Sequence, residues 1–434
     1  MNKILKALGS AWRSISLLSL LLSLMLSLSG CGMSNAGVLK APVEADGLAG
    51  EPAQPEEYGL FYEARSYSLG LYEPEEACYL GGYVLSSKLL NFSSERLDEL
   101  SGKKHAVSSY NLKAGYPFPD TWVLSCIAEM RTPLISVKPQ NSYDPFDKKL
   151  VDKMASEFGE YYVPMFVELF PEPETITSDP EEYIEFFRYA RKVFGEKASN
   201  VAFVWSVDQS QAASSLRYYP GDDWTDWVGI HIFERLDGAG YGNDGLRALD
   251  YFYYTYQKTK PVMISQLGIS HYNSKDKSYR SKEAAEEIQR FYGAIAKKYP
   301  RVKLINYMDV DEVSQVAGKV QDNFLLTQID RILDAYKVAI MDPRFSEATD
   351  ISSSGEVTTQ LMKSPFPAYK VDGEFLASAN SFLYDLNTKG LSGGETLFGQ
   401  KYYNLGGFAR NARRVLEVDD QDKRVIISAI QAKA

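Results

Sequence analysis

The stretch Lys260-Pro-Val-Met-Ile-Ser-Gln266-Leu-Gly268 guides the interpretation of the whole chain. It is a short apolar run that begins after a proline and ends at a glycine, a pattern typical of a buried strand followed by a loop. A polar side chain, Gln266, stands where the expected strand ends. Similar runs recur along the chain, so this stretch is one unit of a repeated pattern.

Eight apolar runs of this kind are separated mostly by segments with helical periodicity. The expected strands are Cys78–Leu85, Ala106–Tyr110, Pro133–Lys138, Tyr161–Phe170, Val201–Val207, Trp227–Phe233, Pro261–Gln266 and Lys303–Asp309. The sequence Asp179-Pro180-Glu181-Glu182 has the residues of a helix start, and the run Tyr251–Tyr256 predicts the buried side of another helix. Eight strand–helix repeats predict an α/β fold, a (β/α)8 TIM barrel. A doubly wound open sheet is the alternative, but the sequence has no GxGxxG or P-loop motif in its favour.

The composition of the chain divides it into five parts. We expect a signal segment at 1–30, a flexible tether at 31–57, the barrel at 58–345, a linker at 346–364 and a small α+β domain at 365–434. In the last part, Arg414–Val418 and Lys423–Ser428 flank an acidic turn and predict a hairpin.

The first 30 residues predict export from the cytoplasm. Lys3, Lys6 and Arg13 precede the apolar run Ile15–Ser29, which is short for a membrane span. The run ends in Leu28-Ser29-Gly30-Cys31, which resembles a bacterial lipobox. The resemblance implies that Cys31 is lipidated and anchors the protein to the cell membrane. A plain secretory signal is the alternative, and either signal places the protein outside the cytoplasm.

Charge and cysteine content exclude several classes of function. Without residues 1–30 the chain has 44 basic and 57 acidic residues, a net charge of −13, so nucleic acid is not an expected partner. Cys78 and Cys126 are expected to be buried free thiols, although a disulfide is the alternative. No cysteine–histidine cluster has the spacing of metal ligands, and we expect neither a metal nor a cofactor.

Several motifs between Cys78 and Phe345 together resemble glycoside hydrolase family 26, a clan A family of barrel enzymes that includes β-mannanases. They occur in the family's order and are Ser101-Gly-Lys-Lys-His105-Ala, Pro133-Leu-Ile-Ser-Val-Lys138-Pro139, Phe203-Val-Trp205-Ser206, Tyr219-Pro-Gly-Asp-Asp-Trp224-Thr-Asp-Trp227-Val-Gly229-Ile and Lys260-Pro-Val-Met-Ile264. The small C-terminal domain weakly resembles the copper amine oxidase N-terminal-like domain, but it has no histidine or cysteine, so we do not infer copper.

The family resemblance implies that two positions are catalytic. The acid/base glutamate falls on Glu172, whereas the nucleophile position holds Gln266, an amide that cannot act as a carboxylate nucleophile. The tyrosine that contacts the nucleophile in the family falls on Phe233. Because both residues have changed together, the retaining mechanism is expected to be lost. Glu234 is a weaker candidate for a relocated carboxylate.

The remaining candidate site residues are expected to contact carbohydrate. They are Trp205, Trp224, Phe233, His231, Lys138 and Glu168. The two tryptophans would offer ring faces to a sugar in an open cleft. Lys138 and Glu168 are expected to form an ion pair, since a lone charge inside a barrel is costly and neighbouring strands bring them close.

Three functions remain open from the sequence. The chain is expected to be a surface-anchored, family 26-like protein directed at a β-linked polysaccharide such as mannan. It would either be a pseudoenzyme or hydrolyse glycosidic bonds with a substitute carboxylate. The third reading is a non-catalytic lipoprotein that binds a cell-wall glycan or another protein, with a purely structural stalk as a weaker variant.

Overall fold

The computed structural model describes residues 55–140, 146–237, 240–242, 244–315, 322–350, 356–386, 388 and 391–429. The expected signal segment, Cys31 and almost all of the tether lie outside the described residues. Of the helices in this part of the chain, none is long and apolar enough to cross a membrane.

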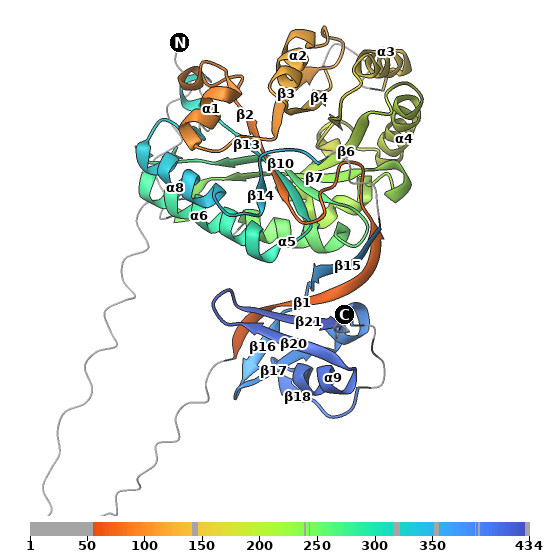
Figure 1. Ribbon diagram of the computed structural model, residues 1–434, viewed down its shortest axis with the longest axis vertical. Helices are drawn as coiled ribbons and strands as arrows, with labels where there is room; N and C mark the ends of the chain where they lie inside the picture. The colour runs from red at the N-terminus through yellow and green to blue at the C-terminus, as the bar shows by residue number, and fades with distance from the viewer. Residues whose placement is uncertain are drawn as a thin grey trace, which may run out of the picture. The chain divides into compact units, whose positions relative to one another are not determined.

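Eight parallel strands close into a barrel (Figure 1). In spatial order they are β2 (Cys78–Tyr83), β3 (Val107–Lys113), β4 (Thr132–Lys138), β5 (Met165–Leu169), β6 (Val201–Asp208), β7 (Trp227–Glu234), β10 (Val262–Ile269) and β13 (Val302–Met308). Hydrogen bonding between β13 and β2 closes the ring, and the short β14 (Phe345–Ser346) adds to β2. The predicted TIM barrel is therefore confirmed. The fourth barrel strand, β5, begins later than expected because Pro164 has no N–H to donate to a central ladder.

Each barrel strand is followed by a helical segment. These are α1 (Ser94–Ser101), α2 (Asp120–Ala128), α3 (Lys148–Gly159), α4 (Pro180–Lys197), the 3₁₀ segment η3 (Gln209–Tyr218), α5 (Asp244–Tyr256), α6 (Ser281–Lys298) and α8 (Asp330–Ile340). Asp179 caps α4 by accepting a hydrogen bond from the Glu181 amide, as its sequence predicts. In α5, the aromatic run buries Phe252, Tyr253 and Tyr256.

The second sheet includes residues that the sequence analysis places in the barrel range. β1 (Glu56–Ser68) pairs with β15 (Glu356–Lys363), β16 (Ala368–Val371) and β21 (Arg424–Ala429). The barrel boundary expected at residue 58 therefore falls inside β1, and the expected linker contains β15. Long-range pairing of this kind leaves no local signal at a domain boundary.

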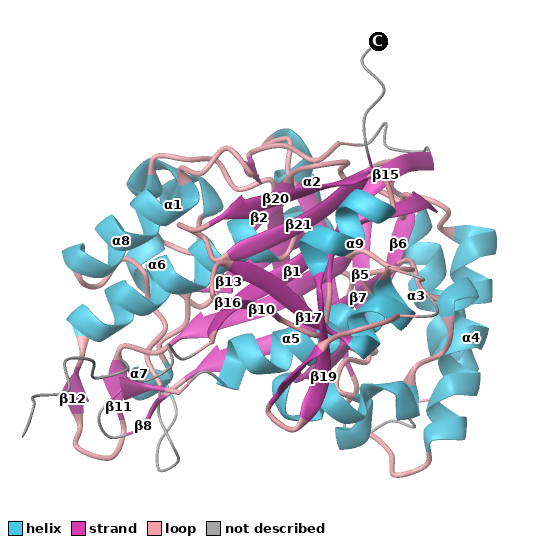
Figure 2. Cartoon of the chain, turned by 90° about the horizontal axis from the view of Figure 1, so that it is seen from below, coloured by secondary structure: helices cyan, strands magenta, loops and turns pink. Residues whose placement is uncertain are grey.

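The other strands of this sheet are β17 (Glu374–Ser378), β18 (Glu395–Leu397), β19 (Gln400–Asn404) and β20 (Arg414–Asp419). β20 and β21 form the expected hairpin. α9 (Leu405–Asn411) contacts β17 and β20 (Figure 2). The second sheet has an apolar core of its own, which includes Tyr58, Leu60, Phe382 and Ile427. In the barrel, Cys78 and Cys126 are buried free thiols, as expected.

Candidate functional site

The interior of the barrel changes from apolar to polar along the strands. One layer near the amino ends consists of Tyr79, Val107, Leu134, Phe166, Val204, Trp227, Met263 and Leu304. The next inward-facing position, two residues further along each of six strands, holds a buried polar or charged side chain. These side chains are Ser109, Ser136, Glu168, Ser206, Ser265 and Asn306. Because side chains alternate along a strand, these point to the same interior. The polar layer lies toward the carboxyl ends, where TIM barrels carry their sites; we call this end the mouth.

His231 on β7 joins two glutamates of the mouth. Its Nδ1 atom lies 2.6 Å from Oε1 of Glu172, and its Nε2 atom lies 2.9 Å from Oε1 of Glu168. The Ser206 hydroxyl also donates to Glu168 Oε1, at 2.6 Å. Glu168 and His231 are buried, whereas 30% of the Glu172 side chain is exposed. Glu172 is therefore the member of this network that a ligand can reach.

The charges of this network stabilise one another. Burial alone would lower the pKa of His231, but the charges and hydrogen bonds of Glu168 and Glu172 raise it to about 9. Burial likewise opposes ionisation of Glu168, yet the charge and hydrogen bond of His231 outweigh it and hold the pKa at about 2. The hydrogen bond from His231 lowers the pKa of Glu172. At neutral pH the network is an imidazolium between two carboxylates.

The loop that carries Glu172 has a strained backbone. Phe170 and Glu172 have φ values of 49° and 59°, in the left-handed region that bulky residues rarely adopt. The Phe170 amide donates to Val137 O at 2.9 Å, and the Glu172 amide donates to Ser206 O at 3.0 Å. Strain held in this way is common at functional sites, and here it fixes the direction of the carboxylate.

Gln266 lies on the strand next to His231. The two residues are partners in the β10–β7 ladder, and a register shift between Ile264 and Gln266 marks a β-bulge at this point. Gln266 is 6% exposed, and its side-chain amide makes no hydrogen bond with any residue in the described part of the chain. Its donors and acceptor are thus not used by the described residues, and its partner in the ladder, His231, contacts Glu172.

The prediction that Lys138 and Glu168 form an ion pair is wrong. Within the described residues no ion pair joins them, and His231 and Ser206 bind Glu168 instead. The register explains the difference, since Glu168 stands opposite Ser136, two residues before Lys138. Lys138 is half-buried and lies nearer the mouth, where its charge also lowers the pKa of Glu172.

The two tryptophans do not face the mouth. Trp205 is fully buried outside the barrel wall, against Tyr219, Phe252 and Tyr256. Strand alternation explains this, because Ser206 takes the inward position. Trp224 is half-buried under Arg188 and lies three residues before β7, at the end opposite the mouth. The expected sugar-stacking role of Trp205 and Trp224 is therefore wrong.

Phe233 and Glu234 end β7 and face different sides. Phe233 packs against Phe324, with its ring centroid 5.4 Å away. Glu234 accepts a hydrogen bond from the Gly245 amide of α5, at 3.1 Å. Burial, followed by the charge of Glu287, raises the pKa of Glu234 to about 7. Glu234 thus lies against the helix layer and not toward the mouth.

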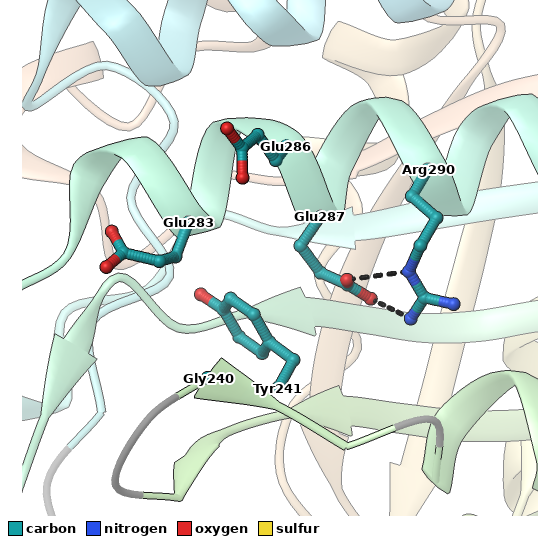
Figure 3. A pocket seen from close by; sticks show the side chains of 6 residues that line it. All are labelled: Gly240, Tyr241, Glu283, Glu286, Glu287 and Arg290. Carbon is teal, nitrogen blue, oxygen red and sulfur yellow. Dashed lines mark hydrogen bonds and ion pairs between the residues drawn. The ribbon is translucent and has the colours of Figure 1, made fainter.

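A cavity of about 260 Å³ has none of the residues of the His231 network in its lining (Figure 3). It is lined by Gly240, Tyr241, Glu283, Glu286, Glu287 and Arg290, on α6 and on β9 (Gly240–Tyr241). Both oxygens of Glu287 bind Arg290, at 2.5 and 2.8 Å. In the described part of the chain, no group of three or more histidine, cysteine, aspartate or glutamate residues could hold a metal ion.

The molecule is thus a (β/α)8 barrel with a carboxylate–imidazolium–carboxylate network at its mouth. No protein-family model and no curated protein matches this sequence. Solved structures similar to this chain include a modular endo-β-1,4-mannanase of glycoside hydrolase family 26 from Cellulomonas fimi, with 12% identity, coverage of 77% of this chain and 94% of that chain, and a TM-score of 0.49.

Two further solved structures are similar to this chain. A family 26 β-mannanase from Bacteroides ovatus shares 11% identity, with coverage of 62% and 90% and a TM-score of 0.45. Thermotoga maritima Cel5A with mannotriose shares 13% identity, with coverage of 61% and 99% and a TM-score of 0.44. These are similarities of fold.

Proposed function

We propose that this chain binds a β-linked polysaccharide such as mannan at the mouth of the barrel and has lost the retaining hydrolysis of the family it resembles. The observation that supports this best is the 2.6 Å contact between His231 and Glu172, beside an amide at residue 266. A retaining glycosidase needs a carboxylate nucleophile and a carboxylic acid that can give up a proton. Here the nucleophile position is neutral, and the accessible carboxyl is held ionised.

The same groups suit binding. An ionised carboxylate accepts hydrogen bonds from sugar hydroxyls, and an amide can both accept and donate. Glu172 is fixed by its backbone and by His231, so little side-chain freedom would be lost on binding. Gln266 offers hydrogen-bonding atoms that no described residue uses.

Active hydrolysis with a substitute carboxylate is the less favoured function. Glu168 is 1% exposed and cannot reach a substrate. Glu234 lies against α5, so it does not face the mouth. The location that we propose, outside the cytoplasm and anchored through a lipid on Cys31, rests on the lipobox-like sequence alone.

The test combines binding and turnover. Purified wild-type protein is titrated with β-1,4-linked manno-oligosaccharides by calorimetry and is then incubated with β-mannan while reducing ends are counted. We expect binding without turnover. A Gln266→Glu, Phe233→Tyr variant tests for a latent retaining mechanism, since it restores the nucleophile and its partner. Robust wild-type turnover with retained configuration would refute the proposal, and so would absence of binding to any β-linked glycan tested.

A further inference from the structure

Two half-exposed aromatic residues that the sequence analysis did not single out lie on the loops of the mouth. Phe92 is 52% exposed and precedes α1, in the loop that follows β2. Tyr116 is 50% exposed, in the loop between β3 and α2. Both loops leave the carboxyl ends of their strands, and these two strands pair directly. Phe92 and Tyr116 therefore lie on neighbouring loops at the end of the barrel that also carries Glu172.

The local backbone conformation is unusual at Phe92, whose side chain is exposed to solvent. Asn91 and Phe92 both have left-handed conformations, with φ values of 50° and 59°. The Phe92 amide donates to Ser87 O at 3.1 Å, and the Asn91 amide donates to Lys88 O at 3.2 Å. A left-handed phenylalanine is strained, and an exposed ring gains little from burial. Two unfavourable features at one residue indicate a use other than folding.

We propose that Phe92 and Tyr116 form the sugar-stacking surface of the mouth, on which the C–H face of a pyranose ring lies. The inference rests on the proposed function and names the residues that would give it affinity. A sugar ring has an apolar face and a rim of hydroxyls. The aromatic rings match the apolar face, and Glu172 and the side-chain amide of Gln266 match the hydroxyls. A polyanionic ligand would fit poorly, because the whole chain has a net charge of −10.

The opposite end of the barrel supplies a matched control. Tyr162 is 97% exposed and lies just before β5, at the amino ends of the strands. It shares its residue type with Tyr116 and is more accessible. If aromatic exposure anywhere on the surface gave affinity, Tyr162 would contribute as much as Tyr116.

The experiment measures affinity for a β-1,4-manno-oligosaccharide by calorimetry, with thermal melting as the check on folding. We expect Phe92→Ala and Tyr116→Ala each to weaken binding by about three- to tenfold, while Tyr162→Ala stays within about twofold of wild type. Phe92→Tyr should retain affinity, and Phe92→Leu should lose it, since leucine keeps apolar area but has no ring face.

The outcomes separate this inference from the proposed function. If wild type binds and both mouth variants bind equally well, the stacking surface is refuted while the proposed function stands. If Tyr162→Ala weakens binding as much as Tyr116→Ala does, the location at the mouth is refuted. If wild type binds no glycan, both the proposed function and the stacking surface are refuted.

Discussion

The Nδ1 atom of His231 lies 2.6 Å from Oε1 of Glu172, at the mouth of the barrel. This contact lowers the pKa of Glu172, because the imidazolium stabilises the ionised carboxylate. The other nitrogen of the same ring binds the buried Glu168. Replacing any one of the three residues therefore changes the charge balance of the other two.

Removal of the imidazolium should destabilise the fold. His231→Ala leaves Glu168 buried beside Ser206 without a cation, and we expect unfolding free energy to fall by about 3–5 kcal/mol, as measured in urea. The matched control is His231→Leu with Glu168→Leu, which removes both charges and should cost clearly less. Equal losses in the two variants would show that the charge pair is not what stabilises this layer.

The contribution of His231 should depend on pH. Its folded pKa of about 9 lies above the ordinary value of 6.5, so its stabilising effect is complete below 6.5 and is lost as pH rises through 9. Glu168 works in the opposite direction, with its effect present above 4.5 and lost as pH falls toward 2. The difference in unfolding free energy between wild type and His231→Gln should therefore be largest near pH 5–6. A difference that is constant from pH 5 to 10 would contradict an imidazolium at this position.

Substitution of Gln266 should separate stability from binding. The residue is 6% exposed, and its amide has no partner in the described part of the chain, so Gln266→Leu should change unfolding free energy by less than about 1 kcal/mol or increase it. The same variant should bind manno-oligosaccharides more weakly, because the amide is lost. Calorimetry and urea unfolding on one preparation check both statements. Unchanged affinity would exclude Gln266 from the binding site.

Phe92→Gly should not destabilise the protein. Glycine adopts the left-handed backbone of residue 92 without steric cost, which offsets the added freedom of the unfolded chain. We expect a change in unfolding free energy within about 1 kcal/mol, together with loss of affinity. A loss above about 2 kcal/mol would mean that the Phe92 ring contributes to folding, contrary to its exposure.

Alanine substitution of Trp205 should reduce stability, whereas alanine substitution of Trp224 should not change glycan binding. Trp205→Ala removes a fully buried ring between the barrel wall and α5, and should cost about 3–5 kcal/mol. Trp224→Ala should leave glycan affinity unchanged, since Trp224 precedes β7 at the far end of the barrel. Thermal melting checks the first statement and calorimetry the second. Weaker binding by Trp224→Ala would show that the glycan binds at the end of the barrel opposite the mouth.

Local patterns explain why so much of the barrel could be predicted. Apolar runs and intervening helical segments are properties of neighbouring residues, so the eight strands and the cap at Asp179 can be inferred without long-range information. Phe92 was missed because its only signal, a left-handed backbone, belongs to the folded loop. Long-range pairing likewise placed β1 in the second sheet.

The sequence by itself determined that an amide, Gln266, stands near the end of the seventh barrel strand, that Glu172 follows the fourth and that the strands alternate with helices. Only the tertiary structure decided that Glu168 binds His231 rather than Lys138, and that Trp205 faces the helices. The physical reason is register: Glu168 stands opposite Ser136, one layer below Lys138, and Trp205 takes the outward phase of its strand. Composition and local periodicity cannot set how far one strand slides along the next, because closure of the whole ring sets it.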